Sequence, residues 1–127
     1  MIVIDSSGWI EFFADGPNAG EFAKRLQRVE NVITPTVAIY EVYKWIKRER
    51  SEDNALDAVA TMKKTIVADL TEEVALTAAD LSLAHGLAMA DAMMLAFARE
   101  NRADFVTTDS GFEGLAGVTV FTKKTNS

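Results

Sequence analysis

The chain opens with a short apolar run that stops at polar residues. The stretch Ile2–Ile4 is followed directly by a carboxylate, two hydroxyls and a glycine at positions 5 to 8. Such a run is typical of a strand buried on both faces of a parallel sheet. Ligands of open α/β sheets bind just beyond the carboxyl ends of the strands, which is where Asp5 would lie. The other interpretation is that Asp5 or Ser6 only caps the next helix.

Short apolar segments alternate with helical patterns along the rest of the chain. Residues 8–18 are expected to form a connection with short helical character. Thr34 is expected to cap a helix that has Pro35 at its first position. Residues 123–127 are expected to form a frayed tail. The other expected strands are 32–33, 65–68, 105–107 and 118–121, and the helices are 19–28, 35–50, 51–63, 71–86 and 88–101. This alternation predicts a single α/β domain over 1–127, with a parallel sheet flanked by helices.

Composition narrows the chemistry that is available to the chain. It has no cysteine and a single histidine, His85, which excludes disulfides, thiolate sites and histidine-rich zinc sites. Catalysis would have to use carboxylates, hydroxyls or lysines. The net charge of −6 argues against binding nucleic acid by bulk charge, although it leaves room for a bound cation and a local basic patch. No segment resembles a signal peptide or a membrane span, so we expect a cytoplasmic protein without membrane contact.

Two acidic residues stand where helical spacing predicts an apolar face. The helical neighbours of Asp91, three and four residues away, are all apolar, and three of the four neighbours of Glu41 are apolar. A carboxylate on an apolar face is unfavourable unless it is paired or binds a metal. The alternative for Asp91 is an acid near a helix start that is stabilised by the helix-end amides.

A fourth acid follows a predicted strand, as Asp5 does. Asp109 comes directly after the strand 105–107, although it could instead be a simple turn residue before Ser110 and Gly111. Four carboxylates that converge at one sheet edge would raise one another's pKa values and would need a cation to stay ionised. In a chain so poor in histidine and cysteine, the fitting cation is Mg²⁺ or Mn²⁺.

Four segments in order resemble the PIN-domain ribonucleases, and in particular the VapC-type toxins of toxin–antitoxin operons. The segments are 3–13 (VIDSSGWIEFF), 34–42 (TPTVAIYEV), 90–98 (ADAMMLAFA) and 107–120 (TTDSGFEGLAGVTV), so the resemblance covers nearly the whole chain. It implies a sheet of strand order 3-2-1-4-5 and an acidic metal site of Asp5, Glu41, Asp91 and Asp109, with Ser6 and Thr107 as polar neighbours. It further implies cleavage of RNA by a metal-activated water, homodimerisation and inhibition by a cognate antitoxin.

Two other hypotheses compete with a nuclease. A receiver-like signalling module would use Asp5, Asp69 after the third strand, Thr107 and Lys123, but it leaves Asp91 without a role. An inactive binding protein that keeps the fold is the other. A basic cluster near the end of the helix 35–50 could contact an RNA backbone. The favoured interpretation is a solvated helix end that complements the helix dipole. The cluster consists of Lys44, Lys47, Arg48 and Arg50.

Overall fold

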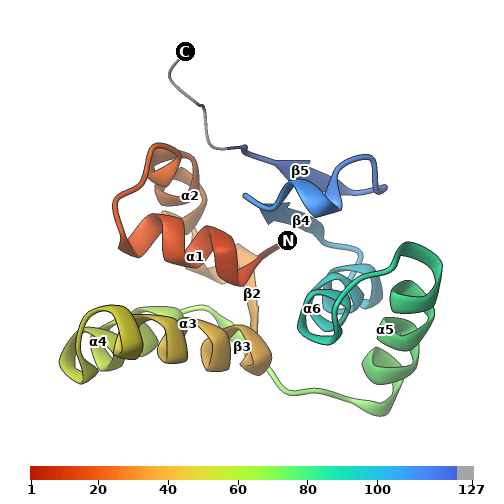
Figure 1. The fold of residues 1–127 in the computed structure, drawn as a ribbon, viewed down its shortest axis with the longest axis horizontal. Helices are drawn as coiled ribbons and strands as arrows, with labels where there is room; N and C mark the ends of the chain where they lie inside the picture. Colours follow the sequence, from red (N-terminus) through yellow and green to blue (C-terminus); the bar gives the residue numbers. More distant parts are fainter. Residues whose placement is uncertain (123–127) are drawn as a thin grey trace.

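A computed structural model describes residues 1–122, and the predicted tail 123–127 lies outside the described residues. A fully parallel five-stranded sheet forms its centre (Figure 1). The strands run in the order β3-β2-β1-β4-β5, as the resemblance implied. Their bounds are Ile2–Ile4 for β1, Val32–Pro35 for β2, Ile66–Ala68 for β3, Asp104–Thr107 for β4 and Val118–Val120 for β5.

Within residues 1–122, six α-helices connect and cover the sheet. They are α1 (Ser6–Phe13), α2 (Ala19–Leu26), α3 (Thr36–Glu49), α4 (Glu52–Met62), α5 (Glu72–His85) and α6 (Met89–Glu100), with short 3₁₀ turns η1 at Val29–Asn31 and η2 at Ser110–Phe112. The chain moves from β1 to β2 to β3 in one direction and then crosses back to β4. Right-handed crossovers therefore place α1–α4 on one face and α5–α6 on the other, and Figure 1 shows these two groups apart.

Two local predictions were wrong in their bounds. The expected connection 8–18 contains a full helix, α1, which begins at Ser6 because the Asp5 carboxylate accepts the Ser6 N–H and caps it. Pro35 is the last residue of β2 and the N-cap of α3 rather than its first helical residue. The predicted end of α5 is confirmed, since the helix ends at His85 and Gly86 follows with φ of 68°.

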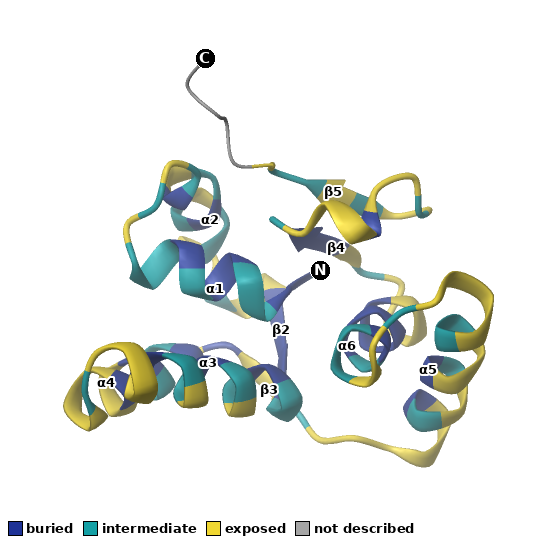
Figure 2. Cartoon of the chain, viewed as in Figure 1, coloured by how far each residue is buried: buried dark blue, intermediate teal, exposed yellow. Residues whose placement is uncertain are grey.

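The core is centred on β1 and β4, and Figure 2 shows β4 in dark blue, the colour of buried residues, over most of its length. Val3, Ile4 and Phe105 are fully buried, together with Trp9 of α1 and Met94 of α6. At the sheet edge, β3 is largely exposed, because only one neighbour covers it. Within residues 1–122 no single helix is long and apolar enough to span a membrane, and only α5 with α6, bent by 117°, passes that test as a pair.

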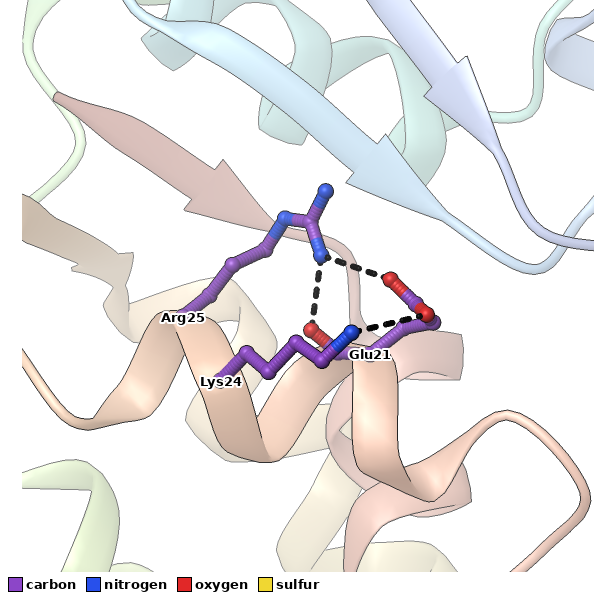
Figure 3. A network of polar contacts seen from close by, with 3 residues as sticks. All are labelled: Glu21, Lys24 and Arg25. Atoms are coloured by element: carbon purple, nitrogen blue, oxygen red, sulfur yellow. Dashed lines mark hydrogen bonds and ion pairs between the residues drawn. The ribbon is translucent and has the colours of Figure 1, made fainter.

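Helix α2 fastens the end of β5 to the rest of the domain. Glu21 forms ion pairs with Lys24 at 3.5 Å and Arg25 at 3.4 Å (Figure 3). The Arg25 guanidinium also lies 4.9 Å from the centre of the Phe121 ring, which packs edge-on against Phe22. The contacts of Arg25 and Phe22 with Phe121 therefore join α2 to the residue just after β5.

Replacement of Gly8 is expected to weaken the fold. A Cβ at this position would lie 2.5 Å from the Phe22 ring and 2.8 Å from Ile4 Cγ2, both of which are fully buried. Gly8→Ala should therefore lower the free energy of unfolding by about 1–3 kcal/mol, the usual range for overpacking. Gly20→Ala on α2 is the control, because a Cβ there meets nothing within 4 Å and should add up to about 1 kcal/mol through helix propensity. Urea denaturation measures the free energy of unfolding of both variants and of wild type. A Gly8→Ala protein as stable as wild type would contradict the prediction.

Candidate active site

The candidate site lies where the strand order reverses direction. The connections from β1 lead to β2 on one side, whereas β4 lies on its other side, so the carboxyl ends of β1 and β4 flank a topological switch point. Ligands of open α/β sheets bind at such a point. Ile4 is paired with Val106, and the Asp5 N–H donates to the Val106 carbonyl at 2.9 Å. The next residue of each strand, Asp5 and Thr107, therefore lies at this edge.

The Asp5 carboxylate is held by three hydrogen bonds. Oδ1 accepts the Ser6 backbone N–H at 2.9 Å, and Oδ2 accepts the hydroxyls of Ser7 at 2.9 Å and Thr107 at 2.7 Å. Ser7 was missed as a site residue from sequence, although its place two residues after the acid was a usable signal. Its hydroxyl also accepts the Thr108 N–H at 3.1 Å, which joins α1 to the end of β4. The carboxylate is thus fixed in orientation before any ligand binds.

Glu41 reaches the same edge from the second turn of α3. Its Oε1 accepts the Ser6 hydroxyl at 2.9 Å, and its side chain is half-buried. Ser6 therefore donates its backbone N–H to Asp5 and its hydroxyl to Glu41, so one residue joins both carboxylates. The prediction of Ser6 as a polar neighbour rested on the family resemblance, and this geometry gives it a physical role.

Asp91 lies in the first turn of α6, which begins at Met89. That position fits the alternative of an acid near a helix start, but the N-cap residue Ala88 provides no side-chain bond and no hydrogen bond to the Asp91 carboxylate is found within residues 1–122. Its side chain is half-buried. The carboxylate is thus left free to meet an external partner.

Asp109 is the most exposed of the four acids and follows β4 by two residues. Its N–H donates to the Thr107 hydroxyl at 3.0 Å, and its Oδ1 accepts the Gly111 N–H at 2.8 Å at the start of η2. Asp109 therefore does stabilise the turn before Gly111, as one of the two sequence interpretations held. This role does not remove the residue from the site, because the charge of Asp109 acts on Asp91.

The electrostatics connect all four acids. The pKa of Asp5 is raised from 3.8 to about 6, mainly by burial and also by the charges of Asp91 and Glu41, against the lowering effect of the Thr107 and Ser7 hydrogen bonds. Burial also raises the pKa of Asp91, followed by the charges of Asp109 and Glu41. Each acid therefore lies close enough to at least one other for its charge to be felt.

These acids do not form a finished ligand set. Among the side chains of residues 1–122, no three Asp, Glu, His or Cys are spaced to hold one metal ion. Like charges repel, so three carboxylates drawn to ligand spacing need a cation to offset them. The donors are nevertheless all hard oxygens, and a buried acid whose pKa is raised gains most from a nearby cation. This chemistry fits a divalent ion such as Mg²⁺ or Mn²⁺.

A buried acid outside the site was missed from sequence. Glu11 of α1 is only 4% exposed, but its Oε2 accepts the Asn18 N–H at 3.2 Å and its carboxylate lies against Gly16. It therefore closes the turn before α2. The helical pattern did not mark Glu11 as unusual, because its neighbours three and four residues away include the polar Ser7 and Asp15.

The sheet order overturns the receiver-like hypothesis. In receiver folds the order is 2-1-3-4-5, so the third strand is next to the first. Here β2 separates β3 from β1, and the exposed Asp69 follows β3 at the edge of the sheet. Asp69 is therefore removed from the position that phosphorylation chemistry would need, and the other residue that this hypothesis used, Lys123, lies outside the described residues.

Comparisons with solved structures agree with this fold. The chain superimposes on a toxin–antitoxin complex from Klebsiella pneumoniae with a TM-score of 0.80 at 18% identity, covering 94% of this chain and 97% of that one. For the Mycobacterium tuberculosis toxin VapC20, which cleaves the sarcin–ricin loop, the TM-score is 0.76 at 21% identity, with 91% and 95% covered. For DNA-bound VapBC from Salmonella typhimurium it is 0.72 at 14% identity, with 97% and 98% covered.

No curated protein matches the chain significantly by sequence. The family model described as the PIN domain matches residues 2–118, which is nearly the whole chain. That match includes all four acids and both strands that carry the switch point. The chain therefore belongs to the PIN-domain family.

Proposed function

We propose that this protein is a divalent-metal-dependent endoribonuclease and the toxin of a type II toxin–antitoxin pair. The observation that carries the proposal is the Asp5 carboxylate, 2% exposed and fixed by three hydrogen bonds at the switch point of a PIN-domain sheet. A buried carboxylate held in one orientation is costly for stability. A bound cation would offset this cost, and its action on a phosphodiester would explain why the carboxylate is buried at this position.

Each site residue has a defined part in this proposal. Asp5 and Asp91 would be the principal holders of a Mg²⁺ or Mn²⁺ ion, and Glu41 and Asp109 would hold the ion or its water molecules. Ser6, Ser7 and Thr107 keep the carboxylates oriented through the hydrogen bonds described above. When bound, such an ion polarises a phosphate and lowers the pKa of a water. The mechanism is hydrolysis without a covalent enzyme intermediate.

The proposed partners are RNA, a cognate antitoxin protein and a second copy of the chain, all in the cytoplasm. Toxin–antitoxin complexes are among the solved structures with this fold, which supports the antitoxin. Leu76, Leu83 and Met89 on α5 and α6 are large apolar side chains that are 62%, 88% and 73% exposed, and their exposure supports association with a second copy. A monomer at micromolar concentration by light scattering would contradict the homodimer.

The experiment for the nuclease activity combines cleavage with metal-induced stability. Incubation with a mixed RNA pool should give cleavage in millimolar Mg²⁺ or Mn²⁺ and none in excess chelator. Mn²⁺ at about one hundred times its dissociation constant should add about 2.7 kcal/mol to the free energy of unfolding, which raises the melting temperature by several degrees.

The two readouts together separate the proposal from a catalytically inactive PIN-domain protein. Metal-induced stabilisation without RNA cleavage would indicate a metal-binding domain that has lost its activity. A melting temperature that millimolar Mn²⁺ leaves unchanged, together with no cleavage, would support the inactive binding protein and refute the nuclease. NaCl at the same ionic strength serves as a control for general screening of the acidic surface.

A further inference from the structure

A groove leads from the acidic site along α3. Its volume is about 220 Å³, and it begins at Ser6 and Glu41, the pair joined by a 2.9 Å hydrogen bond. Beyond them it is lined by Tyr40, Lys44, Trp45 and Arg48. The candidate metal site and this groove therefore share a wall, and any chain that occupies the groove passes Glu41.

The groove has the opposite charge from the site that it adjoins. Residues 41, 44 and 48 are three and seven positions apart and so lie on one face of α3, with the two cations about 5 and 10 Å along the helix axis from Glu41. Lys44 has no carboxylate partner within ion-pair distance in the described part of the chain. Among residues 1–122, Arg48 pairs only with Glu49, at 3.0 Å between two exposed side chains, and such a pair contributes little to stability. Both cations are therefore available to a ligand.

An exposed aromatic ring lines the groove. Tyr40 is 61% exposed, which is unusual for a tyrosine beside an apolar wall, and the Lys44 ammonium lies 5.5 Å from the centre of its ring. Exposed aromatic rings next to cations are the parts from which single-stranded nucleic acid sites are built, since bases stack on the ring while phosphates meet the charge.

From these observations we infer that the groove holds the nucleotide next to the scissile phosphate of an RNA substrate. Lys44 and Arg48 contact successive phosphates of the strand, one each, and the base of that nucleotide stacks on Tyr40. This inference rests on the proposed nuclease function and goes beyond it by giving the direction in which the RNA strand leaves the acids. It replaces the earlier interpretation of these cations as a solvated helix end, because that interpretation did not place them in a groove that begins at Glu41.

An acidic peptide is the other ligand that two cations would attract. A peptide carboxylate accounts for Lys44 and Arg48, but it gives no use for the exposed ring of Tyr40. A substrate cut at the acids must also continue past Glu41, and the groove adjoins Glu41 directly. The RNA therefore accounts for more of the groove.

The test compares Lys44→Gln, Arg48→Gln and Tyr40→Leu with Lys47→Gln. Lys47 is a matched control, because it lies on the same helix and its ammonium is 5.4 Å from the Tyr43 ring, yet neither residue lines the groove. The probe is a fluorescein-labelled single-stranded RNA of mixed sequence, with binding measured in chelator and cleavage in Mn²⁺. All four side chains that are changed are exposed, so the fold should persist.

Lys44→Gln and Arg48→Gln should each weaken binding about fivefold to tenfold and reduce the slope of log K against log salt by about 0.7, the value for one phosphate contact on a single strand. Tyr40→Leu should weaken binding about fivefold or more, and Tyr40→Phe should restore it because the ring is kept. KM should rise in these variants while kcat stays within about twofold, since the lost contacts are equal in substrate and transition state. Lys47→Gln should behave as wild type.

Different failures point to different errors. If wild type cleaves RNA but the groove variants bind and cleave like Lys47→Gln, the groove inference is wrong and the nuclease proposal stands. If wild type neither binds nor cleaves the RNA, both are wrong. If the groove variants lose binding of a labelled poly-glutamate peptide while RNA binding is unchanged, the groove is a peptide site and the inference is overturned.

Discussion

Asp91→Asn should lower nuclease activity by orders of magnitude and leave the metal-free protein at least as stable as wild type. The substitution keeps the size of the side chain at the start of α6 but removes the charge of its carboxylate. The pKa of this carboxyl group is raised by burial and by the charges of Asp109 and Glu41. Loss of that charge relieves repulsion in the metal-free protein. It also weakens cation binding, and with it the stabilisation of charge on the phosphate. Cleavage of a mixed RNA pool and melting temperatures with and without Mn²⁺ measure both effects.

The alternative role of Asp91 predicts a different pattern. If the acid only stabilises the helix start, the same change is nearly harmless, because Asn also suits helix starts. Asp57→Asn on α4 is the control, since Asp57 is exposed and lies far from the switch point. An Asp91→Asn protein that cleaves as fast as wild type and keeps its stabilisation by Mn²⁺ would remove Asp91 from the site.

Asp5→Asn should likewise abolish cleavage, and in addition it should remove a pH dependence from the stability of the metal-free protein. The Asp5 pKa is about 6 in the folded protein and 3.8 in the absence of the fold. Between these pH values the folded state holds a proton that the unfolded state has released, so stability falls as pH rises through this window. The fall amounts to at most about 3 kcal/mol, because one pKa unit corresponds to about 1.4 kcal/mol.

The Asp5→Asn side chain can keep most of the local hydrogen bonds. Its carbonyl oxygen can accept the Ser6 N–H, and its amide can donate to the hydroxyls of Ser7 and Thr107 once these rotate. Urea denaturation at several pH values between 4 and 7 in chelator should therefore show a falling free energy of unfolding for wild type and a flatter profile for the variant. Asp91 contributes in the same direction, so some slope remains. Identical profiles would show that Asp5 does not carry the dependence.

Sequence was sufficient for the fold because its signals are local. The apolar run Ile2–Ile4 and the run before Asp109 mark strands that are buried on both sides, and Gly86 marks a helix end. The strand order came from the resemblance, since periodicity alone does not say which strands are neighbours. The misplacement of α1 has a physical cause: two serines and a glycine have low helix propensity, and the Asp5 cap outweighs it.

The site was only partly predictable for a different reason. Asp91 and Glu41 were found because an acid among apolar helical neighbours is unusual. The same rule does not find the buried Glu11, whose neighbours three and four residues away include Ser7 and Asp15. Ser7 was missed because its role depends on Thr107, one hundred residues away. Lys44 was interpreted as part of a solvated helix end, because only the tertiary fold brings it into the same groove as Ser6. Contacts between distant parts of the chain decide function here, and no local pattern contains them.

The central place of β1 has a consequence for how the protein is synthesised. This first strand lies between β2 and β4, and β4 ends at Thr107, so a ribosome must translate most of the chain before β1 gains its second neighbour. Pairing between segments so far apart is slow to form, since the loop must close first. A nascent chain that stops short of β4 leaves Asp5 without the Thr107 hydroxyl and without Asp109. Truncated translation products therefore lack an assembled site, and the acids meet only once synthesis is nearly complete.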